Sequence, residues 1–78
     1  MTGNKAWRLY ADYGDTVRSI AEWAERPSEE QIGQTIYHWA EKRNWEIPYF
    51  RIWTDEEGSI WYDVGSWSTL LFLKEEKE

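Results

Sequence analysis

Residues that could perform acid–base or nucleophilic chemistry are few in this sequence, and their spacing does not match a catalytic site. His38 is the single histidine, and the chain contains no cysteine. Proton transfer and zinc binding both need partner groups at defined spacing, and His38 has no second histidine or cysteine as a partner. No serine lies in a nucleophile elbow, and no glycine-rich loop follows a strand to bind phosphate. We therefore interpret His38 as a surface residue and expect no enzymatic activity.

Carboxylates are more numerous and occur in two short groups. Asp12 and Asp15 form one group, and Asp55, Glu56 and Glu57 form the other. Either group could contact a hard cation, but neither has the spacing of a calcium-binding loop. A chain this short also has little room for a substrate cleft beside its hydrophobic core. We expect no metal site and no cofactor.

The net charge of −6 is concentrated near the C-terminus. Residues 1–54 carry seven basic and eight acidic side chains, whereas residues 55–78 carry two basic and seven acidic ones. A negative field repels phosphate backbones, so we expect no direct binding of nucleic acid. We interpret the acidic turn and tail as solvated segments that keep the protein soluble. The alternative is an acidic patch that docks on a basic partner.

The 78 residues are expected to form one domain, with residues 1–4 and 75–78 disordered. Stability is marginal at this length, and a chain without cysteine has no disulfides to increase it. The usual substitutes are large aromatic side chains, here seven tryptophans and five tyrosines, or oligomerisation. We expect no secretory signal, because residues 1–5 are polar and no apolar segment follows them, and no apolar run is long enough to span a membrane. We expect a cytoplasmic location and no membrane partner.

The elements that position these residues begin with three predicted strands between Pro48 and Lys74. Nearly every second residue in this stretch is β-branched or aromatic, which is typical of a packed, pleated surface. Asp55–Gly58 and a corner at Gly65-Ser66 are expected to join the three strands. We regard this stretch as the organising part of the fold.

Two more strands are predicted near the N-terminus. Residues 5–13 alternate apolar and polar side chains, which indicates a half-buried strand. Residues 16–24 fit a helical stripe and a strand equally well by periodicity. We favour a strand, because Gly14-Asp15 favours a hairpin and Pro27 leaves little room for a helix before the next one.

A helix is predicted over residues 28–43. Ser28 and Gln31 have the spacing of a capping box, and the glutamates between them suit the positive end of the helix dipole. Asn44 is suited to end the helix in a left-handed conformation. The buried stripe of this helix is predicted to be Ile32, Ile36, Trp39 and Ala40. The resulting ββαβββ order defines an α+β domain, with one helix on one face of a mainly antiparallel sheet.

Both alternating faces of the three C-terminal strands are apolar, and one helix cannot cover both. We expect the helix to cover the face that carries Phe50, Ile52, Leu70 and Phe72. The opposite face is then expected to carry Tyr49, Trp53, Trp61, Trp67, Leu71 and Leu73. Register decides which residues share a face, and a bulge at Gly65 would reassign them.

The uncovered face has two interpretations. Either the twist of a small sheet and the tail bury it within the monomer, or it stays exposed and serves association. We favour association, because tryptophan and tyrosine are enriched at interface hot spots and a large bare apolar patch is rare in monomers. The predicted interaction residues are Tyr49, Trp53, Trp61, Trp67 and Leu71, with the acidic Asp55, Glu56 and Glu57 beside them.

Three functions are compatible with these features. We favour a binding or assembly protein whose partner is another protein or a second copy, most simply in a homodimer. The second possibility is a small-ligand binder that stacks tryptophan and tyrosine on a nucleotide or a sugar. The third is an acidic inhibitor that occupies a nucleic-acid or substrate site of a host enzyme.

One corner of the sequence resembles a corner in small uncharacterised proteins of phages and prophages of Gram-positive bacteria. It consists of Asp63-Val64-Gly65-Ser66-Trp67-Ser68 and is followed by an aromatic strand. The helix start Arg26-Pro27-Ser28-Glu29-Glu30-Gln31-Ile32 is similar as well. The resemblance implies an accessory phage protein in the host cytoplasm that binds or inhibits a host or defence protein. It implies no catalytic residue.

Overall fold

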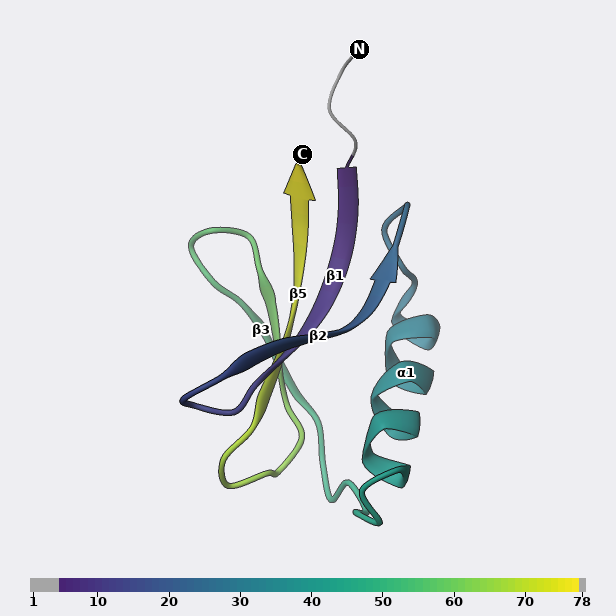
Figure 1. Ribbon diagram of the computed structural model, residues 1–78, viewed down its shortest axis with the longest axis vertical. Helices are drawn as coiled ribbons and strands as arrows, with labels where there is room; N and C mark the ends of the chain where they lie inside the picture. Colours follow the sequence, from purple (N-terminus) through teal and green to yellow (C-terminus); the bar gives the residue numbers. More distant parts are fainter. Residues whose placement is uncertain (1–4, 78) are drawn as a thin grey trace.

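Five strands and one helix follow one another in the order ββαβββ in the computed structural model, which describes residues 5–77 (Figure 1). Their bounds are β1 (Lys5–Asp12), β2 (Val17–Trp23), α1 (Glu29–Glu41), β3 (Arg51–Thr54), β4 (Ile60–Asp63) and β5 (Leu70–Lys77). The strands form one antiparallel sheet in the order β2-β1-β5-β4-β3. The helix lies on one side of this sheet (Figure 1). The predicted α+β layout is confirmed.

The first two strands form the predicted hairpin. The Tyr13 N–H donates to the Thr16 carbonyl oxygen at 2.8 Å, and Gly14 adopts a φ of 94° in the turn. The uncertain stretch after this turn is therefore a strand rather than a helix. The β1–β2 register shifts between Leu9 and Tyr10, where a β-bulge accommodates one extra residue of β2.

The helix begins at the capping box that the sequence predicts. The Ser28 hydroxyl oxygen accepts from the Gln31 N–H at 3.1 Å, and the Gln31 side-chain oxygen accepts from the Ser28 N–H at 2.8 Å. Each bond satisfies a backbone donor that the first turn leaves without a partner. Asn44 follows the C-terminus with a φ of 54°, in the left-handed region.

The core lies between α1 and the middle of the sheet. The helix contributes the predicted stripe, and the sheet contributes side chains from β1, β4, β5 and the residue after β4. The buried members are Leu9, Ala11, Ile32, Ile36, Trp39, Ala40, Tyr62, Val64, Leu71 and Leu73. Burying each large aliphatic side chain contributes about 1.5–3 kcal/mol, so this layer is a major source of stability.

Two expectations about the C-terminal strand are wrong. Glu75, Glu76 and Lys77 are not disordered, because they continue β5 and pair with the first residues of β1. The long β1–β5 pairing supplies the backbone hydrogen bonds that order them. Residues 1–4 and 78, which were also expected to be disordered, lie outside the described residues.

The faces of β5 are also the reverse of those expected. Leu71 and Leu73 point toward α1 and are fully buried, whereas Leu70 and Phe72 point away from it. The β4–β5 register explains the reversal, because Leu71 lies opposite Tyr62, a core residue. Residues opposite each other on antiparallel strands share a face, so Leu71 must face the helix too.

Candidate functional site

A row of four aromatic rings crosses the sheet on the face opposite α1. Each ring lies opposite the next one on the neighbouring strand, in the order Trp53, Trp61, Phe72 and Tyr10 from β3 to β1. The ring centroids are 6.3 Å apart for Trp53 and Trp61, 4.6 Å for Trp61 and Phe72, and 4.9 Å for Phe72 and Tyr10. We call these four residues the aromatic row.

The aromatic row remains accessible to solvent. Trp53, at the β3 end, is 43% exposed, and the other three rings are partly exposed. The rings pack against their neighbours in the row, but α1 lies on the other side of the sheet (Figure 1). Aromatic side chains in such cross-strand pairs stabilise each other by roughly 0.5–1.5 kcal/mol and still leave their outer surface for a partner.

One ring of the row is held in position by a carboxylate. The Trp61 indole nitrogen donates to Asp55 Oδ2 at 2.7 Å, while Asp55 Oδ1 accepts from the backbone N–H groups of Glu57 and Ser59 at 2.9 and 3.0 Å. The bond from Trp61 lowers the pKa of Asp55 most, and the turn's N–H groups lower it further, while desolvation acts in the opposite direction. The acidic turn therefore fixes the orientation of Trp61.

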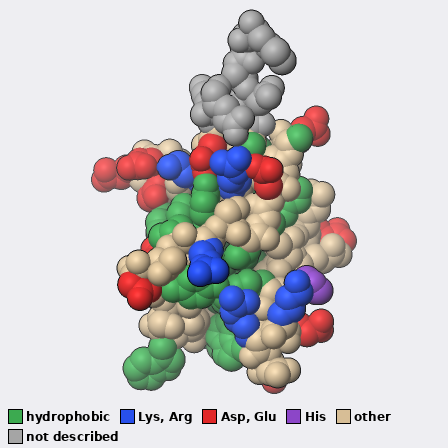
Figure 2. Space-filling model, in the orientation of Figure 1, with side chains coloured by type: hydrophobic (Ala, Val, Ile, Leu, Met, Phe, Trp, Pro, Cys, Tyr) green, Lys and Arg blue, Asp and Glu red, His purple; other side chains and the backbone are tan. Residues whose placement is uncertain are grey.

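Charged residues surround the aromatic row. Arg8 lies on the same face of β1 as Tyr10 and pairs with Glu22 at 2.6 Å and with Glu76 at 3.3 Å. Figure 2 shows acidic side chains gathered where Figure 1 places the turn between β3 and β4. An aromatic centre with a charged rim is the usual composition of a protein interface.

The structure separates the predicted interaction residues into different environments. Trp53 and Trp61 lie together in the aromatic row, and Asp55 holds Trp61. Glu56 and Glu57 are exposed in the same turn. Tyr49 is exposed outside the row and lies under the Arg51 guanidinium, 5.5 Å from the ring centroid.

Leu71 and Trp67 do not lie where the sequence analysis placed them. Leu71 has no exposed area and belongs to the core, so its assignment to the uncovered face is wrong. Trp67 is fully exposed, but it lies in the loop before β5 rather than on a strand, and it is not part of the row. The loop occupies residues that were expected to extend β5.

Two members of the row, Tyr10 and Phe72, were not among the predicted interaction residues. Alternation in β1 places Tyr10 on the same side as Arg8 and Asp12, which is correct but gave no reason to connect it with β5. The missing information is that β1 lies between β2 and β5 in the sheet. Pairing of the first and last strands is non-local, and no short sequence pattern reports it.

A hollow of about 510 Å³ lies between α1 and the strands β3 and β4. Its walls include Ile32 and Ile36 from the helix and Ile52 and Ile60 from the strands, with Arg26 at its edge. The hydroxyl of Tyr62, another lining residue, is desolvated by burial, which raises its pKa, and the nearby Glu29 raises it further while Arg26 lowers it. The hollow shows that α1 does not extend over the β3 edge of the sheet.

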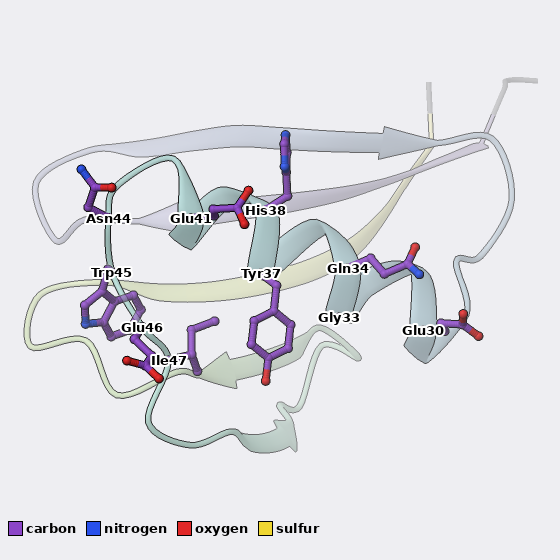
Figure 3. A pocket seen from close by; sticks show the side chains of 10 residues that line it. All are labelled: Glu30, Gly33, Gln34, Tyr37, His38, Glu41, Asn44, Trp45, Glu46 and Ile47. Carbon is purple, nitrogen blue, oxygen red and sulfur yellow. The ribbon is translucent and has the colours of Figure 1, made fainter.

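A larger hollow of about 1070 Å³ lies along α1 beside residues 44–47 (Figure 3). Its lining side chains do not converge: Glu30 and Asn44 lie at opposite ends, and Tyr37 and His38 point in different directions (Figure 3). A binding site needs polar groups that meet at one point on a ligand. This open surface lacks that arrangement, in spite of its size.

His38 is exposed on α1, as predicted. Within residues 5–77, histidine, aspartate and glutamate do not gather in groups of three or more that could hold a metal ion. Over the same residues, the helix is not long or apolar enough to cross a membrane. Comparisons with protein-family models, with curated proteins and with solved structures find no match to this chain.

Proposed function

We propose that this chain is a non-enzymatic binding protein and that the aromatic row is the centre of its binding surface. The observation that carries the proposal is the row itself: four rings in register across four strands, on the face that α1 does not cover. Rings left at a surface lose little conformational entropy on binding and bury a large area when a partner covers them. The partner proposed is a protein surface.

The charge distribution supports a protein partner over a nucleic acid. Single-stranded nucleic acids also stack on aromatic rows, but their binding surfaces combine the rings with a basic groove along the backbone. Here the whole chain carries a net charge of −6, and Arg8, beside the row, is already paired with two glutamates. The proposal therefore excludes direct binding of nucleic acid.

A second candidate function is stacking on a sugar or a nucleobase. It is favoured by one observation: the Trp53 and Trp61 rings lie within 8° of parallel, so that they form a flat platform at the β3 end of the row. A flat ligand could cover both rings at once. The acidic charge of the protein favours an uncharged ligand over a phosphorylated one.

The resemblance of the Asp63–Ser68 corner to phage and prophage proteins supplies a setting for the proposal. In the structure this corner bends at Gly65, whose N–H donates to Asp63 Oδ1 at 3.0 Å, before the chain enters β5. In that setting the chain is an accessory phage protein, and the aromatic row contacts a host or defence protein.

The indole N–H signals in NMR spectra test the proposal, because they report each tryptophan separately. The protein is diluted from millimolar to micromolar concentration, mixed with lysate proteins of a Gram-positive host, and titrated with neutral sugars and nucleosides. We expect the Trp53 and Trp61 signals to respond in at least one series, while the signal of the buried Trp39 does not.

Matched variants make this test specific. Trp53→Lys removes its own indole signal and should abolish the response of Trp61, whereas Gln34→Lys, on the exposed side of α1, should change neither the Trp53 nor the Trp61 response. The two substitutions add the same charge on opposite sides of the molecule. The proposed function would be contradicted if the Trp53 and Trp61 signals of the parent protein did not change in any of the three series. It would also be contradicted if both variants lost the Trp61 response to the same extent.

A further inference from the structure

The edge strand β3 is exposed on both of its faces. Ile52, on the side of α1, is 59% exposed, and Trp53, on the opposite side, is 43% exposed. The other edge strand, β2, differs, because Ile20, Ala21 and Trp23 pack against the core. A partner that stacked on one face of the sheet would cover Trp53 but not Ile52. A strand added at the β3 edge would lie beside both.

The backbone of β3 has groups available for such a strand. The Asp55 N–H donates to the Ser59 carbonyl oxygen at 3.0 Å, so Asp55 points its backbone groups toward the β4 side. Backbone direction alternates along an antiparallel strand, so Arg51 and Trp53 also point toward β4. Ile52 and Thr54 therefore present their N–H and C=O groups at the outer edge, where β3 has no neighbouring strand among residues 5–77.

We infer that a second copy of this chain pairs with the β3 edge, antiparallel, with Trp53 opposite the partner's Trp53. Alternate residues of a strand point to opposite faces of the sheet. Two residues that lie opposite each other across the two-fold axis therefore share a face only if their numbers are both odd or both even. In this register Ile52 lies opposite the partner's Thr54, so the outward backbone groups of the two strands meet. The inference rests on the proposed function, because the same ring, Trp53, forms the centre of the interface.

Charge selects this register over its nearest alternative. With Trp53 on the axis, Arg51 lies opposite the partner's Asp55 on the same face, and the pair occurs twice by symmetry. With Ile52 on the axis instead, Arg51 lies opposite the partner's Trp53, and Asp55 lies opposite the partner's Tyr49. Of these two registers, only the first pairs opposite charges across the interface, which favours it. A slip in the other direction, with Thr54 on the axis, would need the turn residue Glu57 as the partner of Arg51, beyond the end of β3.

The dimer would join two aromatic rows end to end in one continuous sheet. It also gives the exposed Ile52 a neighbour, because the partner's Thr54 lies beside it at the open end of the smaller hollow. The strand is short, with four residues, so the interface falls in the small, transient class and dissociation constants in the micromolar range are expected.

Sedimentation equilibrium and cysteine cross-linking test the inference together. The chain has no cysteine, so single-cysteine variants report one position each. Residues on a two-fold axis of an antiparallel pair approach within disulfide distance. Trp53→Cys removes the central ring but adds no charge and keeps the backbone bonds and the two Arg51–Asp55 pairs, and therefore it should still form a linked dimer under mild oxidation. We expect this reaction to be at least about tenfold faster than that of the exposed control Gln34→Cys, because pairing raises the effective concentration.

The proline variant Thr54→Pro removes one outward N–H and should lower the dimer fraction without changing the circular dichroism spectrum. If this variant does not fold, the cross-linking rates of the folded cysteine variants decide the question. Faster linking of Ile52→Cys than of Trp53→Cys would overturn the register.

A parent protein that stays monomeric at millimolar concentration would overturn the inference. The proposed function would survive that result if the Trp53 signal still responds to a host protein or to a small ligand. A dimer that both Thr54→Pro and Trp53→Lys leave intact would overturn the inference and remove self-association from the proposed function.

Discussion

The two faces of the sheet are built from alternating residues of the same strands, but only one face is covered by α1. On β5, Leu71 and Leu73 face the helix with no exposed area, while Leu70 and Phe72 face away and stay partly exposed. Hydrophobicity along β5 does not distinguish these positions. What differs is the element packed against each face.

The residue types on the two faces differ in a way that fits this asymmetry. The covered side of the central strands is mainly aliphatic, whereas the open side carries the aromatic row. An aliphatic side chain is stabilised when another element buries it. Stacked aromatic rings shield one another from water, and an indole can also donate a hydrogen bond. Trp61 does so to Asp55. The comparison indicates that the open face tolerates solvent and is also suited to a partner.

The largest expected effect is the contrast between Leu71→Ala and Leu70→Ala. Leu71→Ala leaves a cavity under α1 and should cost about 2–5 kcal/mol of the free energy of unfolding. Leu70→Ala removes a partly exposed side chain on the open face and should cost about 1 kcal/mol or less. Urea unfolding, followed by circular dichroism at low protein concentration, measures both. Equal losses at the two positions would show that the faces are equally covered.

The helix and its buried stripe could be predicted from sequence because their signals are local. The capping residues Ser28 and Gln31 and the buried Ile32 and Ile36 all belong to the first turns of one helix. The regular backbone of that helix fixes their relative positions. The assignment of Phe50 and Ile52 to the side of α1 was correct for the same reason, since alternation within one strand is local.

The face of β5 and the full aromatic row could not be predicted, because both depend on pairing between distant segments. Residues 64–69 form an irregular loop, so alternation in β4 does not continue into β5. The Phe72–Tyr10 contact depends on β1 lying beside β5, which is a property of the whole sheet. Local patterns thus identified the residues that could bind, and only the fold showed which of them lie together.

The corner that sets the face of β5 can be tested with Gly65→Ala. Gly65 has a φ of 84°, and an added Cβ would lie 2.5 Å from Pro48 Cγ. Gly14 has a similar φ of 94°, but an added Cβ there meets no atom within 4 Å. Both alanines carry a conformational cost of about 1 kcal/mol, and only Gly65→Ala adds a steric cost of roughly 1–3 kcal/mol.

Urea unfolding of the two glycine variants gives the difference, and NMR contacts of Leu71 with α1 show whether the face assignment survives. We expect Gly65→Ala to be the less stable variant, with Leu71 still under the helix in the folded fraction. Equal stability of the two variants would indicate that Pro48 moves away easily and that the corner does not fix the register.

The smallest expected effect concerns the pH dependence of the open face. Hydrogen bonds, first of all the one from Trp61, hold the pKa of Asp55 below its ordinary value. Because the folded-state pKa lies below the unfolded one, the carboxylate's contribution to stability is complete above the unfolded pKa. It is lost as the pH falls through the folded-state pKa.

Trp61→Phe keeps a ring in the row but removes the donor to Asp55. The pKa of Asp55 should therefore rise toward its ordinary value, and stability should depend less on pH in the acidic range. Trp53→Phe is the matched control, because it changes the neighbouring ring and leaves the bond to Asp55 in place. An NMR titration of the Asp55 carboxyl carbon measures the shift directly. If Asp55 titrated in Trp61→Phe as it does in the parent, the N–H groups of Glu57 and Ser59 would be the groups that stabilise the carboxylate, and the acidic turn would not depend on the aromatic row.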